Sequence, residues 1–161
     1  MLKRVRRFDP LQAQLVAKAF RKRGVRYLFI GRSGAILLGY PSTTQDVDLY
    51  AEKTPENGRR IAAALRGLSF EVDARLEEAL VQGRDFVQIK SGPFDIDLVF
   101  APDGIEDFAK AYQRREPNGD YPIANIRDII ASKRASGRAK DRVELPLLEA
   151  FREEYEKQRH Q

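Results

Sequence analysis

Two pairs of aspartates alternate with apolar residues, and their type and spacing suit metal-dependent chemistry. Asp46 and Asp48 are separated by one apolar residue, as are Asp95 and Asp97. Side chains alternate between the faces of a β-strand, so the carboxylates of each pair would share one face, about 6.6 Å apart at their Cα atoms. Both could then reach one or two metal ions, and such oxygen ligands prefer Mg²⁺ or Mn²⁺. The ordinary alternative is the solvated face of a half-exposed strand.

A glycine- and serine-containing segment offers a second chemical feature. Gly31, Arg32, Ser33 and Gly34 follow an apolar stretch and precede another one. Backbone N–H groups at the start of a helix can approach a phosphate closely where glycine leaves room. Ser33 adds a hydroxyl group and Arg32 adds a guanidinium group. This segment therefore indicates a phosphate-binding turn between a strand and a short helix.

Two better-known phosphate-binding motifs are excluded. Gly34 and Gly39 have the spacing of a P-loop, but Tyr40 and Pro41 stand where Lys and Ser or Thr are required. No G-x-G-x-x-G segment follows an expected strand, so a dinucleotide-binding fold is unsupported. Residues 31–34 match the GXXG loop of a KH module, but two glycines alone are a weak signal.

The amino-acid composition excludes several kinds of catalytic and metal-binding site. The 161 residues include no cysteine and one histidine, His160, which excludes disulfides, thiol nucleophiles, cysteine-bound zinc and histidine triads. No apolar run approaches the roughly 20 residues of a membrane span, and residues 1–7 lead into no apolar signal segment. We therefore expect a cytoplasmic protein with no membrane partner, whose chemistry depends on carboxylates, hydroxyls, Lys and Arg.

Basic residues are concentrated in two stretches. Residues 1–26 contain nine Lys or Arg and a single acid, Asp9, whereas the whole chain has a net charge of +5. A second stretch, 127–142, has six basic and two acidic residues. Such asymmetry fits a polyanionic partner such as RNA, DNA or a nucleotide, although a solvated helix face has the same composition.

The expected elements form one α+β domain, with a small mixed β-sheet flanked by helices and a helical C-terminal tail. Apolar periodicity, caps and turn residues predict helices over 11–23, 35–40, 55–68, 75–82, 105–112, 125–136 and 141–158, with a kink at Pro146, and strands over 25–30, 47–50, 86–90 and 94–100. A turn is expected at 117–119. Within the single domain 1–161, we distinguish a basic N-terminal helix (1–24), a catalytic core (25–100) and C-terminal helices (105–158).

Together these features resemble the minimal nucleotidyltransferases of the DNA polymerase β-like superfamily. That family has an apolar residue, Gly and Gly or Ser, then a short spacer, two aspartates alternating with apolar residues, and a third carboxylate on a separate strand. Residues 30–33, 46–49 and Asp97 stand in these places, and 43–45 resemble the Arg/Thr-rich approach to the first aspartate. The resemblance covers about residues 25–150 and departs at Arg32, where Gly or Ser is usual.

A C-terminal segment extends the resemblance. Residues 133–141 are similar to the Lys…Gly-Arg-x-Lys-Asp segment of small relatives, including those in toxin–antitoxin and phage-defence loci. The resemblance implies transfer of a nucleoside monophosphate from a triphosphate, with ATP the first expectation, to an acceptor hydroxyl. It implies that Mg²⁺ or Mn²⁺ is held by Asp46, Asp48 and Asp97, with Asp95 as the alternative to Asp97. The implied nucleotide-binding residues are Gly31, Arg32, Ser33, Thr44, Lys133 and Arg138, with Lys140 a further candidate.

Several questions stay open at the level of sequence. The acceptor could be tRNA or another RNA, a protein or a small molecule, and a homodimer or a cognate partner chain could complete the site. A catalytically degenerate protein of the same fold, which binds nucleotide, RNA or a partner, is the main alternative, and Arg32 favours it. A Mg²⁺-dependent nuclease is a third hypothesis, but no His or Lys stands beside Asp46 and Asp48 as a general base.

Overall fold

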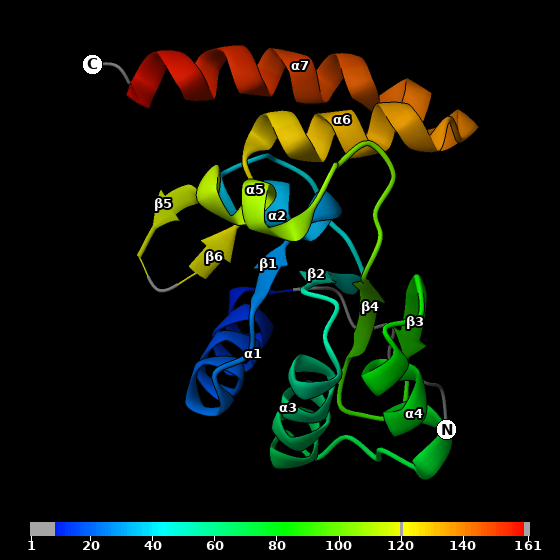
Figure 1. The fold of residues 1–161 in the computed structure, drawn as a ribbon. Coiled ribbons are helices and arrows are strands. Elements are labelled where there is room, and N and C mark those ends of the chain that lie inside the picture. Colours follow the sequence, from blue (N-terminus) through cyan, green and yellow to red (C-terminus); the bar gives the residue numbers. More distant parts are fainter. Residues whose placement is uncertain (1–8, 120, 160–161) are drawn as a thin grey trace, which may run out of the picture.

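A six-stranded mixed sheet carries helices on both faces in the computed structural model, which describes residues 9–119 and 121–159 (Figure 1). The strands are β1 (Tyr27–Phe29), β2 (Asp46–Ala51), β3 (Phe86–Ile89), β4 (Asp95–Val99), β5 (Glu116–Asn118) and β6 (Tyr121–Ile123). Their order is β3-β4-β2-β1-β6-β5. The pairs β2–β4 and β1–β6 are parallel, and the other neighbours are antiparallel. The predicted mixed α+β fold is therefore confirmed.

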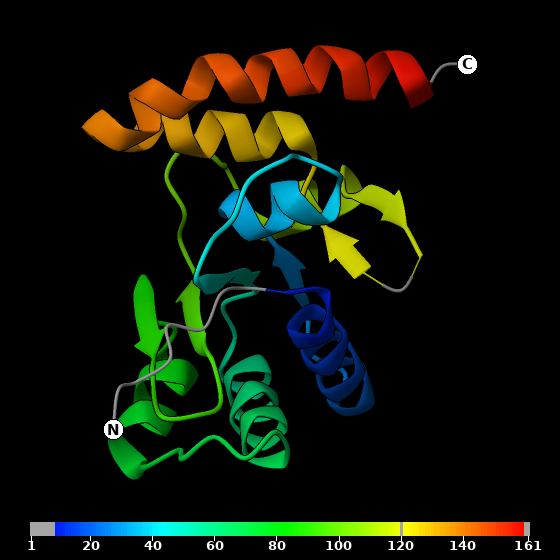
Figure 2. The same ribbon diagram turned by 180° about the vertical axis from the view of Figure 1, so that it is seen from behind.

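Seven helices cover the sheet within the described ranges. They are α1 (Pro10–Arg23), α2 (Gly31–Leu37), α3 (Pro55–Gly67), α4 (Ala74–Gln82), α5 (Phe108–Gln113), α6 (Ile126–Ser136) and α7 (Ala139–Arg159). Both views show α1, α3 and α4 on one side of the sheet and α2, α5, α6 and α7 on the other, with α7 outermost (Figures 1 and 2). Within these ranges, no helix combines the length and apolar character needed to cross a membrane.

The alternation along β2 and β4 gives the sheet two different faces. Val47 and Leu49 of β2, and Ile96 and Leu98 of β4, are at most 1% exposed and belong to the core shared with α1, α3 and α4. The alternate positions face the side that carries α2 and α6, where a second core contains Tyr50. A strand shows opposite faces at successive residues, so the apolar positions that anchor the strands also direct the aspartates to the second face.

Helix boundaries follow the predicted signals. The Asp9 side chain accepts a hydrogen bond from the Gln12 N–H, and the Gln12 side chain accepts one from the Asp9 N–H. The two residues thus form a capping box at the start of α1. Gly24 ends α1 with a φ of +68°, a left-handed conformation that favours glycine. The Thr54 hydroxyl accepts the N–H of Asn57 and so caps α3, with Pro55 in the first turn.

Three differences from the predicted elements bear on the site and the sheet. The short helix begins at Gly31, so residues 31–34 form the first turn of α2 and not a loop before it. The last helix begins at Ala139, two residues before its predicted start, and includes Pro146 as predicted. The turn at 117–119 belongs to a β5–β6 hairpin, which was missed because Pro117 and Pro122 face each other in it and proline weakens a strand signal. Residues 1–8, which include four of the nine basic residues of the first basic stretch, and His160 lie outside the described residues.

Candidate active site

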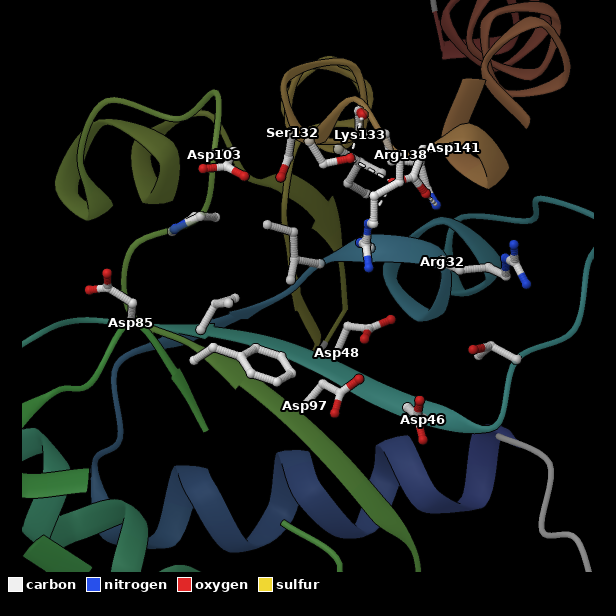
Figure 3. Close-up of a pocket in the computed structure, with 18 of the residues that line it drawn as sticks. Arg32, Asp46, Asp48, Asp85, Asp97, Asp103, Ser132, Lys133, Arg138 and Asp141 are labelled. Carbon is white, nitrogen blue, oxygen red and sulfur yellow. Dashed lines mark hydrogen bonds and ion pairs between the residues drawn. The ribbon is translucent and has the colours of Figure 1, made fainter. Parts of the chain in front are cut away.

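A cavity of about 820 Å³ opens over the second face of the sheet (Figure 3). It is bounded by β2, β4, the start of α2, the C-terminal half of α6 and the beginning of α7. Most of the residues predicted from the sequence line it, namely Gly31, Arg32, Thr44, Asp46, Asp48, Asp97, Lys133, Arg138 and Lys140. Ser33 and Asp95 are not among its lining residues. The pocket thus brings together segments that are up to about 110 residues apart in the chain.

The parallel pairing of β2 with β4 places the acidic residues side by side. Asp48 pairs with Asp97 and Asp46 pairs with Asp95 in the strand register. Asp46, Asp48 and Asp97 line the pocket, so of the two aspartates of β4 it is Asp97 and not Asp95 that joins Asp46 and Asp48 there. The Oδ1 atom of Asp97 is buried and has no hydrogen-bond partner among the residues that the structure describes.

The acidic environment disfavours ionisation at two positions. Burial raises the pKa of Asp48 to about 7, and the neighbouring Asp97 carboxylate adds to this effect. Burial likewise raises the pKa of Asp97 to about 6, with a further contribution from Asp46 and an opposing hydrogen bond from Gln88. Gathered carboxylates raise one another's pKa because like charges repel. The folded chain therefore binds protons at this site more readily than an unfolded chain does.

The pH dependence of stability should report this site. Carboxyl groups titrate near pH 4 in the unfolded chain, whereas the pKa values of Asp48 and Asp97 are about 7 and about 6 in the folded chain. Between these values the folded state binds more protons than the unfolded state. The contribution of both groups to the free energy of unfolding is therefore full below about pH 4 and is lost as the pH rises through about 7. We expect the free energy of unfolding of the wild type, relative to the Asp48→Asn/Asp97→Asn variant, to fall across this range in urea titrations. A difference that does not vary with pH would contradict these pKa shifts.

The donor chemistry of the three carboxylates fits a hard divalent cation. They supply only oxygen atoms, one of which has no partner, and a cation would relieve the repulsion that raises two of the pKa values. Within residues 9–119 and 121–159, the side chains of His, Cys, Asp and Glu form no group of three or more with an arrangement that could hold a metal ion. The residues predicted as ligands thus share one face and one pocket, while the metal itself stays a prediction.

Gly31 is required by the contact between α2 and β2. Its φ is +63°, and a Cβ atom at this position would lie 2.8 Å from Oδ2 of Asp48. L-residues with a side chain rarely adopt this conformation, and the carboxylate leaves no room for a methyl group. The glycine therefore allows the start of α2 to lie directly against the acidic side chains.

Ser33 connects the same two elements through its hydroxyl group. The buried hydroxyl donates to the carbonyl oxygen of Ile30 over 3.2 Å and accepts the N–H of Asp48 over 2.9 Å. Sequence reasoning assigned this hydroxyl to phosphate, whereas in the structure it fixes the backbone of Asp48. Ser33 thus aligns a candidate ligand from behind the pocket.

Arg32 connects α2 to the distant helix α7. Its Nε donates to Oε1 of Glu144 over 3.2 Å, its Nη2 forms a second, short hydrogen bond to the same carboxylate, and its Nη1 donates to the carbonyl of Thr43 over 3.3 Å. Burial opposes ionisation of Glu144, but Arg32 and Lys133 outweigh it and lower the pKa of this carboxyl group. The arginine that departs from the family pattern thus closes one side of the pocket.

A double-mutant cycle should measure this connection. Arg32→Ala leaves Glu144, which is 7% exposed, with the longer ion pair to Lys133 at 3.6 Å, and the loss of a bidentate partner from a buried charge is costly. We expect each single variant to lose about 1–3 kcal/mol of unfolding free energy and the Arg32→Ala/Glu144→Ala variant to lose less than their sum. Additive losses in urea titrations would show that the two side chains do not interact in solution.

A buried acid on α7 pairs with two further basic residues of the wall. Asp141 is 2% exposed, and its carboxylate forms ion pairs with Lys133 at 3.4 Å and Arg138 at 3.0 Å and accepts the Ser136 hydroxyl. The sequence resemblance included Asp141 as the last residue of the segment 133–141 but gave it no ion-pairing role, and Glu144 was missed. Their spacing of three residues places both on one helix face, which is the signal that could have identified them.

Comparisons with known proteins agree with this architecture. No protein-family model matches the sequence, and no curated protein matches it. Among solved structures, the chain is similar to the solution structure of the antibiotic-resistance factor ANT(2'')-Ia, an aminoglycoside nucleotidyltransferase. The two are 19% identical, with a TM-score of 0.50 over 95% of this chain and 97% of that one.

The fold is thus that of a nucleotidyltransferase. The likeness does not show membership of the minimal nucleotidyltransferases or an association with toxin–antitoxin loci.

Proposed function

We propose that this chain is a Mg²⁺-dependent nucleotidyltransferase, which transfers a nucleoside monophosphate from a triphosphate to an acceptor hydroxyl. The observation that carries the proposal is the pocket, in which three carboxylates on one sheet face lie opposite a basic wall. A nucleoside triphosphate with divalent cations has the complementary distribution of charge. The fold supports the proposal because a solved nucleotidyltransferase shares it.

The pocket residues form two groups, one that would bind the cation and one that would bind the phosphates. Asp46, Asp48 and Asp97 would hold Mg²⁺ or Mn²⁺, which when bound neutralises charge on the phosphate oxygens and polarises the reacting phosphorus. Lys133 and Arg138 would bind the β- and γ-phosphates, together with Lys140. These side chains act through position and charge, which is where most catalysis of phosphoryl and nucleotidyl transfer arises.

The chemical step needs one proton acceptor from the chain. The acceptor hydroxyl forms a bond to the α-phosphorus while the bond from this phosphorus to the bridging oxygen of the β-phosphate breaks, and pyrophosphate leaves. Asp97 would accept the hydroxyl proton, since its Oδ1 has no hydrogen-bond partner among the described residues. Gly31 would let the substrate phosphates approach the start of α2.

The proposed acceptor is a class of molecule that carries a free hydroxyl group. RNA, including tRNA, is favoured over a protein or a small molecule by the exposed basic residues of α1, which include Lys18, Lys22 and Arg23. A cognate partner chain or a second copy could supply further acceptor contacts. Action in the cytoplasm, within a toxin–antitoxin system, is the biological setting that the sequence resemblance suggests.

One observation favours a second candidate, a protein of the same fold that binds nucleotide or RNA without transfer. Arg32 stands where the family has a small residue, and its side chain is committed to Glu144. Such a protein would keep the pocket and its affinity for nucleotide but would not form a new phosphodiester bond.

Labelled nucleotides separate the two candidates. Incubation of the protein with Mg²⁺, total RNA and either [α-³²P]ATP or [γ-³²P]ATP should label RNA only from the α-position. Because the γ-phosphate leaves with pyrophosphate, label from both positions would indicate a different reaction. Absence of label with RNA, with total protein and with each of the other three triphosphates would support the binding protein.

A further inference from the structure

The two ends of the pocket differ in charge. Arg32 lies at one end and Asp85 and Asp103 lie at the other, with Asp46, Asp48 and Asp97 between them and Arg138 over Asp48 (Figure 3). A triphosphate chain is repelled by the acidic end and attracted by the basic one. A bound nucleoside triphosphate therefore has one favoured direction in the pocket, with its nucleoside toward Asp85.

The end near Asp85 also presents an exposed aromatic ring. Phe86 is 54% exposed at the start of β3, the edge strand of the sheet. Val87 and Ile89 are buried, so the alternating residues Phe86 and Gln88 point to the pocket face. An exposed phenyl ring in the wall of a polar pocket leaves apolar surface in water, and binding of a flat ligand would remove this cost.

The strand register places Phe86 close to the reacting centre. Phe86 pairs with Val99, which lies two residues beyond Asp97 on β4, a separation of about 7 Å along the strand. Val99, Ala101 and Pro102 line the pocket beside it and add apolar surface at this end. The Phe86 ring thus lies close enough to Asp97 for one nucleoside to span the distance between them.

We propose that Phe86 forms the surface on which the nucleobase of the bound triphosphate stacks. The inference rests on the proposed function, because it takes a nucleoside triphosphate as the ligand. It assigns the base to the Phe86 end and the β- and γ-phosphates to Lys133 and Arg138. Stacking on an aromatic ring tolerates any base, so the four triphosphates would bind through the same contact.

A tryptophan reporter tests the contact directly. The chain contains no tryptophan, so Phe86→Trp introduces a single fluorophore at the site. With Mg²⁺ present, ATP and GTP should quench its emission, whereas inorganic tripolyphosphate, which has no base, should bind without the same quenching. Equal responses to ATP and to tripolyphosphate would overturn the stacking.

Affinity measurements supply the second test. Phe86→Ala should weaken binding of ATP by about tenfold and leave binding of tripolyphosphate unchanged, since loss of one base-stacking contact has an effect of this size. Leu147→Ala is the matched control, because Leu147 is 62% exposed on α7 and does not line the pocket. The control should bind both ligands as the wild type does.

The outcomes separate this inference from the proposed function. If the wild type binds ATP and Phe86→Ala binds it equally well, the stacking is wrong and the nucleotide site stands. If Phe86→Ala weakens ATP and tripolyphosphate alike, Phe86 acts on the pocket as a whole and the inference is also wrong. If the wild type binds neither ligand, the proposed function fails together with the inference.

Discussion

Asp48→Asn is expected to lower nucleotidyl transfer by about a thousandfold or more and to stabilise the folded protein. The substitution removes a carboxylate that would hold the divalent cation, and such a cation contributes several kcal/mol to the transition state. It also removes a group whose pKa is raised to about 7 by burial and by Asp97, so the folded state no longer bears its charge above that pH. We expect the free energy of unfolding at pH 8 to rise by about 1–3 kcal/mol.

Asp95→Asn is the matched control for this result. Asp95 pairs with Asp46 in the same strand ladder but does not line the pocket. The variant should therefore retain activity close to that of the wild type, measured as release of pyrophosphate from ATP in the presence of acceptor. A large loss of activity in Asp95→Asn with none in Asp48→Asn would mean that the site is misplaced along the two strands.

Gly31→Ala is expected to abolish activity and to destabilise the fold. A methyl group there would lie 2.8 Å from Oδ2 and 3.0 Å from Cγ of Asp48, and the φ of +63° is unfavourable for alanine. Either Asp48 or the first turn of α2 has to move, so the carboxylate leaves its position. Thermal denaturation and pyrophosphate release should both show the loss, with a free-energy cost above the roughly 1 kcal/mol that a left-handed alanine incurs.

Gly24→Ala separates backbone strain from the contact with Asp48. Gly24 has a φ of +68°, but its nearest neighbour for a Cβ atom is the Arg60 side chain at 3.5 Å, an ordinary contact. This residue ends α1, away from the pocket. We expect a loss of about 1 kcal/mol in stability with activity retained. Equal behaviour of the two alanine variants would show that Gly31 matters only for its conformation.

Local patterns were sufficient to predict most of the elements and the acidic part of the site. Alternation placed Asp46 and Asp48 on one strand face, and helix caps such as Asp9 and Thr54 are encoded within a few residues of the elements that they begin. Both signals depend on neighbours in sequence, and the structure retains them. Asp95 and Asp97 face the same side of β4, so alternation alone does not separate them. The extent of the pocket separates them, because of the two only Asp97, the residue preferred from the sequence, lines it.

Contacts between distant segments could not be predicted in this way. Arg32 and Glu144 are 112 residues apart, so nothing near Arg32 indicates that its guanidinium is bound by α7. The hydroxyl of Ser33 was assigned to a ligand because the sequence does not show that the N–H of Asp48 needs an acceptor there. Phe86 reads as an ordinary strand residue until the sheet order makes β3 an edge beside the pocket.

Binding of a metal–triphosphate complex in the pocket over β2 and β4 can be measured without an acceptor. The measurement is the thermal stability of the wild type and of Asp48→Asn with Mg²⁺ and each of the four nucleoside triphosphates. A ligand that binds only the folded state raises the melting temperature, and at a given concentration a tighter ligand raises it further. We expect a Mg²⁺-dependent rise for at least one triphosphate in the wild type and its loss in Asp48→Asn. An equal rise in the variant, or no rise with any triphosphate, would contradict this expectation.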